Sequence, residues 1–96
     1  MFSWDTAKAL RNREKHGVAF EEAATVFADP DALDWDNTQH SLREERFKRL
    51  GMSLAGRVLL VAYTVRRVKN AKENVRIISA RQASRRERRA YAGQPH

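Results

Sequence analysis

Arginine is the residue type near the end of this chain that is best suited to chemistry. Arg81 closes an apolar segment, and Arg85, Arg86 and Arg88 follow in a short basic stretch. A guanidinium keeps its charge at physiological pH, and its planar fork matches two oxygens of a phosphate. A strand ending at Arg81 and a helix starting beside it are expected to present several guanidinium groups to one phosphate. The candidate phosphate-binding residues are Arg46, Arg49, Arg57, Arg85 and Arg88.

Side chains that can carry protons accompany these arginines. RNA is cut without a metal when the neighbouring 2′-hydroxyl attacks the phosphate. That route needs a base for the hydroxyl proton, an acid for the leaving 5′-oxygen and cations around the crowded phosphorane. Histidine, carboxylates and tyrosine suit the first two roles. The candidate catalytic residues are therefore His40, Glu45, Arg81, Arg86, Glu87 and Tyr91.

Several of these candidates also have an ordinary structural use. Glu87 stands three residues after Ser84, which is the spacing of a helix capping box. Tyr91 lies four residues beyond Glu87, so it can anchor the same helix to a sheet. His40 can be a surface histidine in a polar loop. The sequence leaves both interpretations open for each residue.

Most other kinds of active site lack a sequence pattern here. The chain has no cysteine, and no two of its three histidines have the spacing of metal ligands. Its four glycines are isolated, so no phosphate-binding glycine loop is present, and no nucleophile elbow supports a catalytic serine. We expect neither a metal site nor a cofactor.

Charge is distributed unevenly along the chain. Residues 1–56 carry 8 basic and 10 acidic side chains, a balance of −2, whereas residues 57–96 carry 11 basic and 2 acidic side chains, a balance of +9. A field of this kind attracts polyanions, nucleic acid above all. An acidic partner protein fits equally well, and a solvated arginine-rich helix is the simplest alternative.

The positions of caps, breakers and apolar residues predict helices at both ends. A first helix follows Asp5, a good N-cap, and ends at Gly17, with Lys15 and His16 in its last turn. A second helix spans about Phe20 to Phe27, although Ala19 stands where a capping serine is expected. A basic helix closes the chain from Ser84 to Tyr91.

Between these helices the apolar period becomes that of strands. Strands are predicted at 33–36, 46–52, 57–65 and 75–81, with a polar tip at 66–74. The expected fold is α+β: two N-terminal helices, a mostly antiparallel four-stranded sheet and a C-terminal basic helix, with the helices on one sheet face. Ninety-six residues make one domain, 1–96. No apolar run approaches a membrane span and the N-terminus lacks a signal-peptide pattern, so we expect a cytoplasmic protein without membrane contact.

Three blocks of residues resemble one family. They are Trp4-Asp5 with Lys15-His16-Gly17-Val18 and Phe20 to Pro30, then His40 to Arg57, then Arg76-Ile-Ile-Ser-Ala-Arg81 with Arg86-Glu87-Arg88 and Tyr91. In this order and spacing they resemble the BrnT toxins over about residues 2 to 91. Two departures are Ala19 and the basic tip at 66–74, which is longer than the family's usual turn.

The resemblance implies a RelE-like fold and a ribonuclease that blocks translation. It also implies an RNA substrate and a cognate BrnA-type antitoxin that resembles ribbon-helix-helix proteins, with operator DNA bound only through the toxin–antitoxin complex. A non-catalytic basic module that binds nucleic acid or an acidic protein is the alternative function.

Overall fold

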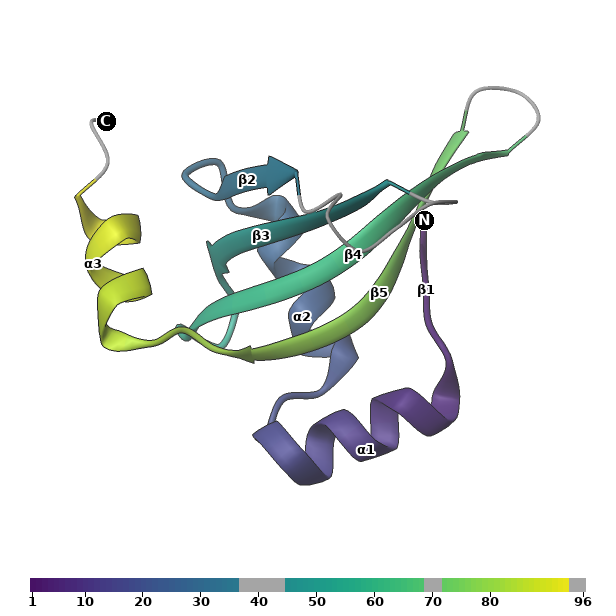
Figure 1. Cartoon of the computed structure of the whole chain (residues 1–96), viewed down its shortest axis with the longest axis horizontal. Helices are drawn as coiled ribbons and strands as arrows, with labels where there is room; N and C mark the ends of the chain where they lie inside the picture. The colour runs from purple at the N-terminus through teal and green to yellow at the C-terminus, as the bar shows by residue number, and fades with distance from the viewer. Residues whose placement is uncertain (37–44, 69–71, 94–96) are drawn as a thin grey trace.

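Five strands form one mixed sheet in the order β1-β5-β4-β3-β2 (Figure 1). The computed structural model describes residues 1–36, 45–68 and 72–93. In chain order the elements are β1 (Phe2–Ser3), α1 (Thr6–His16), α2 (Phe20–Thr25), a short 3₁₀ helix η1 (Val26–Ala28), β2 (Leu33–Asp36), β3 (Arg46–Met52), β4 (Val58–Val68), β5 (Lys72–Gln82) and α3 (Arg85–Ala92). Among the described helices, none combines the length and the apolar character needed to cross a membrane.

The α+β class is confirmed, but the sheet has one strand more than predicted. Strands β2 to β5 pair antiparallel, whereas β1 pairs parallel with β5 and places Phe2 opposite Val75. The expectation of four strands was wrong because a two-residue strand has no measurable period. Its pairing depends entirely on a partner more than seventy residues away.

The hairpin of β4 and β5 extends further than its apolar residues indicate. Its ladder continues to Val68 and Lys72, through most of the segment 66–74 that was predicted to be a polar tip. An antiparallel ribbon holds its backbone hydrogen bonds even where both faces are polar. Within the ladder Ser79 pairs with Ala62 and Ile77 with Tyr63, so Ile78 is an extra residue in a bulge.

A buried asparagine attaches α1 to the edge of the sheet. Because β1 pairs with β5 only at Val75 and Arg76, the edge of β5 is open at Ala80. The Asn12 side chain closes it: Nδ2 donates to the Ala80 carbonyl at 2.8 Å, and the Ala80 N–H donates to Oδ1 at 3.1 Å. Nδ2 also donates to the Val18 carbonyl at 2.9 Å. One side chain thus replaces the hydrogen bonds of a neighbouring strand.

The main core lies between the first two helices and one face of the sheet. It is formed by Val18, Phe20, Ala23, Val26, Leu59, Val61, Ile77 and Ala80. Helix α2 ends at Thr25, and the chain continues as 3₁₀ helix to Ala28, so the second helix is shorter than predicted. Asp5 and Gly17 cap α1 as predicted, and Ala19 gives α2 no side-chain cap.

Helix α3 packs on the opposite face of the sheet. Leu60 follows the core residue Leu59 and therefore points the other way, into a cluster of Leu50, Leu60 and Ala83 with Leu33, Val58 and Tyr91 packed against it. The expectation that the helices share one face was wrong because the amphipathic pattern shows that a helix has a buried side, not which sheet face receives it. Figure 1 shows α2 behind the sheet, α1 along the β5 edge and α3 beyond the C-terminal end of β5. Part of the α3 face of the sheet remains uncovered by helices.

Candidate functional site

A hollow lined by cations opens on the uncovered part of this sheet face. In the ladders Lys48 pairs with Ala62, Ala62 with Ser79, and Leu60 with Arg81, and residues paired in this way share a face. The hollow, of about 210 Å³, is lined by His16, Lys48, Leu60, Ala62, Ser79, Ala80 and Arg81. We call it the central hollow. It brings together a lysine, an arginine, a hydroxyl and an imidazole from three separate segments.

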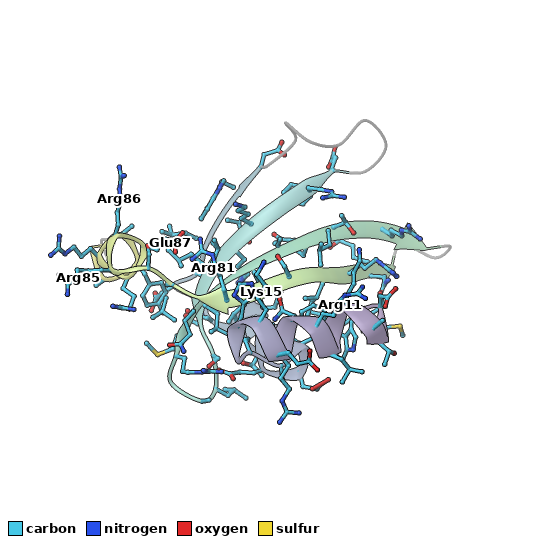
Figure 2. All side chains as sticks on the ribbon, turned by 60° about the horizontal axis from the view of Figure 1, so that its bottom comes forward. Arg11, Lys15, Arg81, Arg85, Arg86 and Glu87 are labelled. Carbon is cyan, nitrogen blue, oxygen red and sulfur yellow. The ribbon has the colours of Figure 1, made fainter. Side chains whose placement is uncertain are left out.

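Glu87 orients the arginine of this hollow. Arg81 donates to both carboxylate oxygens of Glu87, from Nη1 to Oε1 at 2.7 Å and from Nη2 to Oε2 at 2.9 Å. Oε1 also accepts the Ser84 N–H, and the Ser84 hydroxyl accepts the Glu87 N–H, so the predicted capping box is present. Figure 2 shows Glu87 on the side of α3 that faces Arg81. Strand end and helix start are therefore joined through one carboxylate.

The ionisation of Glu87 follows from these contacts. The hydrogen bonds from Arg81, and after them the N–H of Ser84, lower the pKa of Glu87 from 4.5 to about 2. The same pair raises the pKa of Arg81 above its ordinary value. A carboxylate with so low a pKa is a weak base and does not act as an acid near neutral pH. The geometry therefore favours a positioning role for Glu87 over proton transfer.

A second hollow adjoins the central one along α1. It has a volume of about 320 Å³ and is lined by Lys8, Arg11, Asn12, Lys15, His16, Ile78 and Ser79. His16 and Ser79 line both hollows, so the two form one continuous surface. We call the second one the α1 hollow. Figure 2 shows Arg11 and Lys15 on α1 beside the strand that carries Arg81.

Sequence reasoning missed the residues that α1 and β3 contribute to these hollows. Residues 1–56 are acidic in sum, which hid the cations at positions 8, 11 and 15. Their spacing of three and four residues places them on one side of a helix, and this signal was available. No local pattern marks Lys48 or His16, because each joins Arg81 only through the packing of α1 and the register of the sheet.

The arginines of α3 do not gather around Arg81. Arg85 and Arg86 are exposed, and Figure 2 shows both projecting from α3 away from Arg81. Arg88 donates to the Ala83 carbonyl at 2.9 Å. The expected convergence on one phosphate does not hold, because successive positions on a helix point in different directions.

Two other predicted phosphate ligands form structural contacts elsewhere. Arg49 donates to Asp34 at 2.7 Å and to the carbonyls of Val26 and Asp29, with its guanidinium 5.0 Å above the Phe27 ring. Arg57 binds the Glu22 carboxylate, which lowers the pKa of Glu22. Neither arginine lines the central hollow or the α1 hollow.

The remaining predicted residues lie outside the central hollow or outside the described residues. The Tyr91 hydroxyl donates to Asp29 at 2.6 Å, which raises the pKa of Tyr91 to about 12. Glu45 lines a separate hollow with Phe47, Val65 and Glu73. Arg46 is exposed and pairs with Thr64. It lies on β3 two residues before Lys48, on the same face of the sheet. His40 lies outside the described residues.

The described residues contain no cluster of metal-ligating side chains. Within 1–36, 45–68 and 72–93, no group of three or more His, Asp or Glu side chains is arranged to hold a metal ion. What the central hollow offers is positive charge, hydrogen-bond donors and one imidazole, a set suited to a phosphate group.

Comparison with known proteins places the chain in a family. No curated protein matches it. A family model described as the ribonuclease toxin BrnT of type II toxin–antitoxin systems matches residues 4–87. This range covers most of the chain and includes every residue that lines the two hollows. The chain therefore belongs to the BrnT family of ribonuclease toxins of type II toxin–antitoxin systems.

Proposed function

We propose that the chain is an endoribonuclease toxin that cuts RNA at the central hollow without a metal ion. The observation that carries the proposal is the meeting of His16, Lys48 and Arg81 in one hollow of about 210 Å³. The two cations are suited to hold a phosphate and to offset charge on its phosphorane. Among the described residues lining this hollow, His16 is the one that offers an imidazole, the commonest general acid or base in enzymes.

The proposed reaction uses the RNA's own 2′-hydroxyl as the nucleophile. His16 accepts the 2′-hydroxyl proton or protonates the leaving 5′-oxygen, while Arg81 and Lys48 bind the phosphate oxygens. Glu87 acts through Arg81, since it holds the guanidinium fork in place. The second proton transfer needs another residue, and His40, a candidate from the sequence, is the first to test for that role.

The proposal extends to the consequences in the cell. Cleavage of RNA used in protein synthesis would block translation in the cytoplasm. A BrnA-type antitoxin, with a ribbon-helix-helix fold and an acidic segment, would silence the toxin by covering the cationic hollows. The complex would reach operator DNA through the antitoxin alone.

The test is RNA cleavage by purified protein freed of its antitoxin, in the presence of EDTA. We expect fragments ending in a 2′,3′-cyclic phosphate. Arg81→Ala is expected to lower the rate about 10²- to 10³-fold, the usual loss when one donor to a charged transition state is removed. Arg89→Ala removes one exposed arginine from α3 and serves as the matched control, with a rate within about twofold of wild type. Intact RNA with folded wild-type protein, or equal rates for both variants, would reject the proposal.

One observation favours the non-catalytic alternative. Arg85 and Arg86 spread outward from α3, as the cations of a binding surface do (Figure 2). A binding module predicts that RNA is bound with a steep dependence on salt and recovered uncut. The end-group assay separates the two functions because only an enzyme generates new ends.

A further inference from the structure

The α1 hollow holds three cations, and no carboxylate of the described residues lines it. Asp5, the N-cap of α1, attracts Lys8 and Arg11 electrostatically from outside the hollow. Lys8, Arg11 and Lys15 line it, together with Asn12, His16, Ile78 and Ser79, and this lining includes no Asp or Glu. Within the described part of the chain, none of the three forms a salt bridge. Clustered cations of this kind repel one another, so the hollow carries a positive potential that favours an anionic ligand.

Other arginines of the same molecule do form salt bridges, and they contrast with the cations of the α1 hollow. Arg49, Arg57 and Arg81 each form a salt bridge, with Asp34, Glu22 and Glu87 respectively. Arg49 and Arg57 join parts of the fold outside both hollows, and Arg81 joins β5 to α3 while it also lines the central hollow. The cations of α1 form no such salt bridge within the described residues, and the Asp5 carboxylate that attracts two of them lies outside the hollow, so their charge is available to a ligand.

The position of α1 beside β5 indicates what kind of anionic ligand the α1 hollow can bind. Lys8 to Lys15 spans roughly 10 Å along the α1 axis, at about 1.5 Å per residue. The hydrogen bonds of Asn12 to Ala80 fix this row beside β5, and His16 and Ser79 line both hollows. A chain of phosphates that enters the central hollow can therefore continue along α1.

We propose that the α1 hollow is a subsite for the phosphates of single-stranded RNA next to the bond that is cut. This subsite rests on the proposed ribonuclease function and extends it to the path of the substrate. Its described lining contains no Phe, Tyr or Trp, so it grips the backbone and tolerates any base sequence. The chain thus binds a run of nucleotides rather than a single phosphate.

The experiment measures binding without cleavage. The probe is a single-stranded RNA whose 2′-hydroxyls are methylated, so that no 2′-oxygen can attack, and its affinity for the full chain is measured from low to moderate salt. For single strands, each lost phosphate contact makes the slope of log K against log salt less negative by about 0.7. Arg11→Gln is expected to change the slope by about this amount, and the Lys8/Arg11/Lys15→Gln triple variant by about 2.

A matched control lies on the same helix. Arg13 is exposed and falls on the opposite side of α1 from Arg11, so Arg13→Gln removes the same charge without touching the hollow. We expect Arg13→Gln to keep the wild-type slope. Thermal unfolding by circular dichroism checks that all variants remain folded.

The outcomes separate this subsite from the ribonuclease activity. If wild type binds the methylated RNA with the α1-dependent slope but cuts no RNA, the α1 hollow stands as a site for RNA phosphates and the proposed activity fails. An unchanged slope in the folded triple variant overturns the subsite even if wild type is an active nuclease. The subsite is equally overturned if the triple variant loses only its affinity for the antitoxin, because α1 would then be an interface for a protein.

Discussion

The two basic helices of this toxin differ in where their charges point. Helix α3 has the denser sequence, with arginines at 85, 86, 88 and 89, yet Arg85 and Arg86 project into solvent (Figure 2). Helix α1 lies in the half of the chain with net negative charge, yet Lys8, Arg11 and Lys15 line a hollow. Charge density along a sequence therefore does not locate a site. The site is located by the direction in which each charged side chain points relative to the sheet.

The two helices also differ in how they are attached. Buried Asn12 holds α1 to β5 through two hydrogen bonds with Ala80, and it donates a third to the Val18 carbonyl. Helix α3 is held by half-exposed contacts, namely the pair of Arg81 with Glu87 and the hydrogen bond of Tyr91 to Asp29. We expect α1 to be rigidly placed and α3 to be the weaker attachment. Variants of the residues that attach each helix test this contrast.

The largest effect is expected from Asn12→Ala. The change leaves the Ala80 N–H and C=O and the Val18 C=O buried without their partner, which costs about 2–4 kcal/mol of unfolding free energy. For a domain of this size each kcal/mol corresponds to roughly 4–8 °C in Tm. Urea and thermal unfolding measure the loss.

Arg13→Ala is the control for that variant. Arg13 follows Asn12 and is exposed, so we expect its replacement to change the free energy of unfolding by less than about 0.5 kcal/mol. Equal stabilities for the two variants would show that Asn12 does not fix α1 to the sheet.

A smaller effect, with a distinctive pH dependence, is expected from Glu87→Gln. Glutamine preserves the capping box but loses the ion pair with Arg81. The folded pKa of Glu87, about 2, lies below its ordinary 4.5, so its contribution to stability is complete above about pH 5 and disappears as the pH falls through 2. Because Arg81 is 40% exposed, solvent screens the pair and we expect about 1 kcal/mol at pH 7.

The measurement is the stability difference between wild type and Glu87→Gln at pH 7 and at pH 2. The difference should shrink at the lower pH, where Glu87 is protonated in the unfolded protein and partly protonated in the folded one. A difference that stays constant would mean that the charge of Glu87 contributes nothing.

An effect of similar size, confined to one helix end, is expected from Ser84→Ala. Loss of this N-cap hydroxyl should cost about 1 kcal/mol and fray the first turn of α3. Hydrogen exchange should accelerate at Glu87 and Arg88 while the amides of α1 keep their protection. Faster exchange in α1 as well would show that the two helices are not attached independently.

Local features of the sequence predicted much of this fold. The caps at Asp5 and Gly17, the capping box of Ser84 with Glu87, and the strands at 33–36 and 46–52 all occur as expected. Each depends on residues close together in the chain. The strand β1 and the face chosen by α3 could not be predicted, because both depend on partners distant in sequence.

The sequence by itself determined the family, the α+β class and the abundance of cations, since these depend on residue order and composition alone. Only the tertiary structure decided which cations meet. His16, Lys48 and Arg81 share a hollow because of the register of β3, β4 and β5 and because Asn12 seats α1 on the sheet edge. Such pairings join residues far apart in the sequence, and the local hydrophobic periodicity of a segment does not predict which distant segment it will contact.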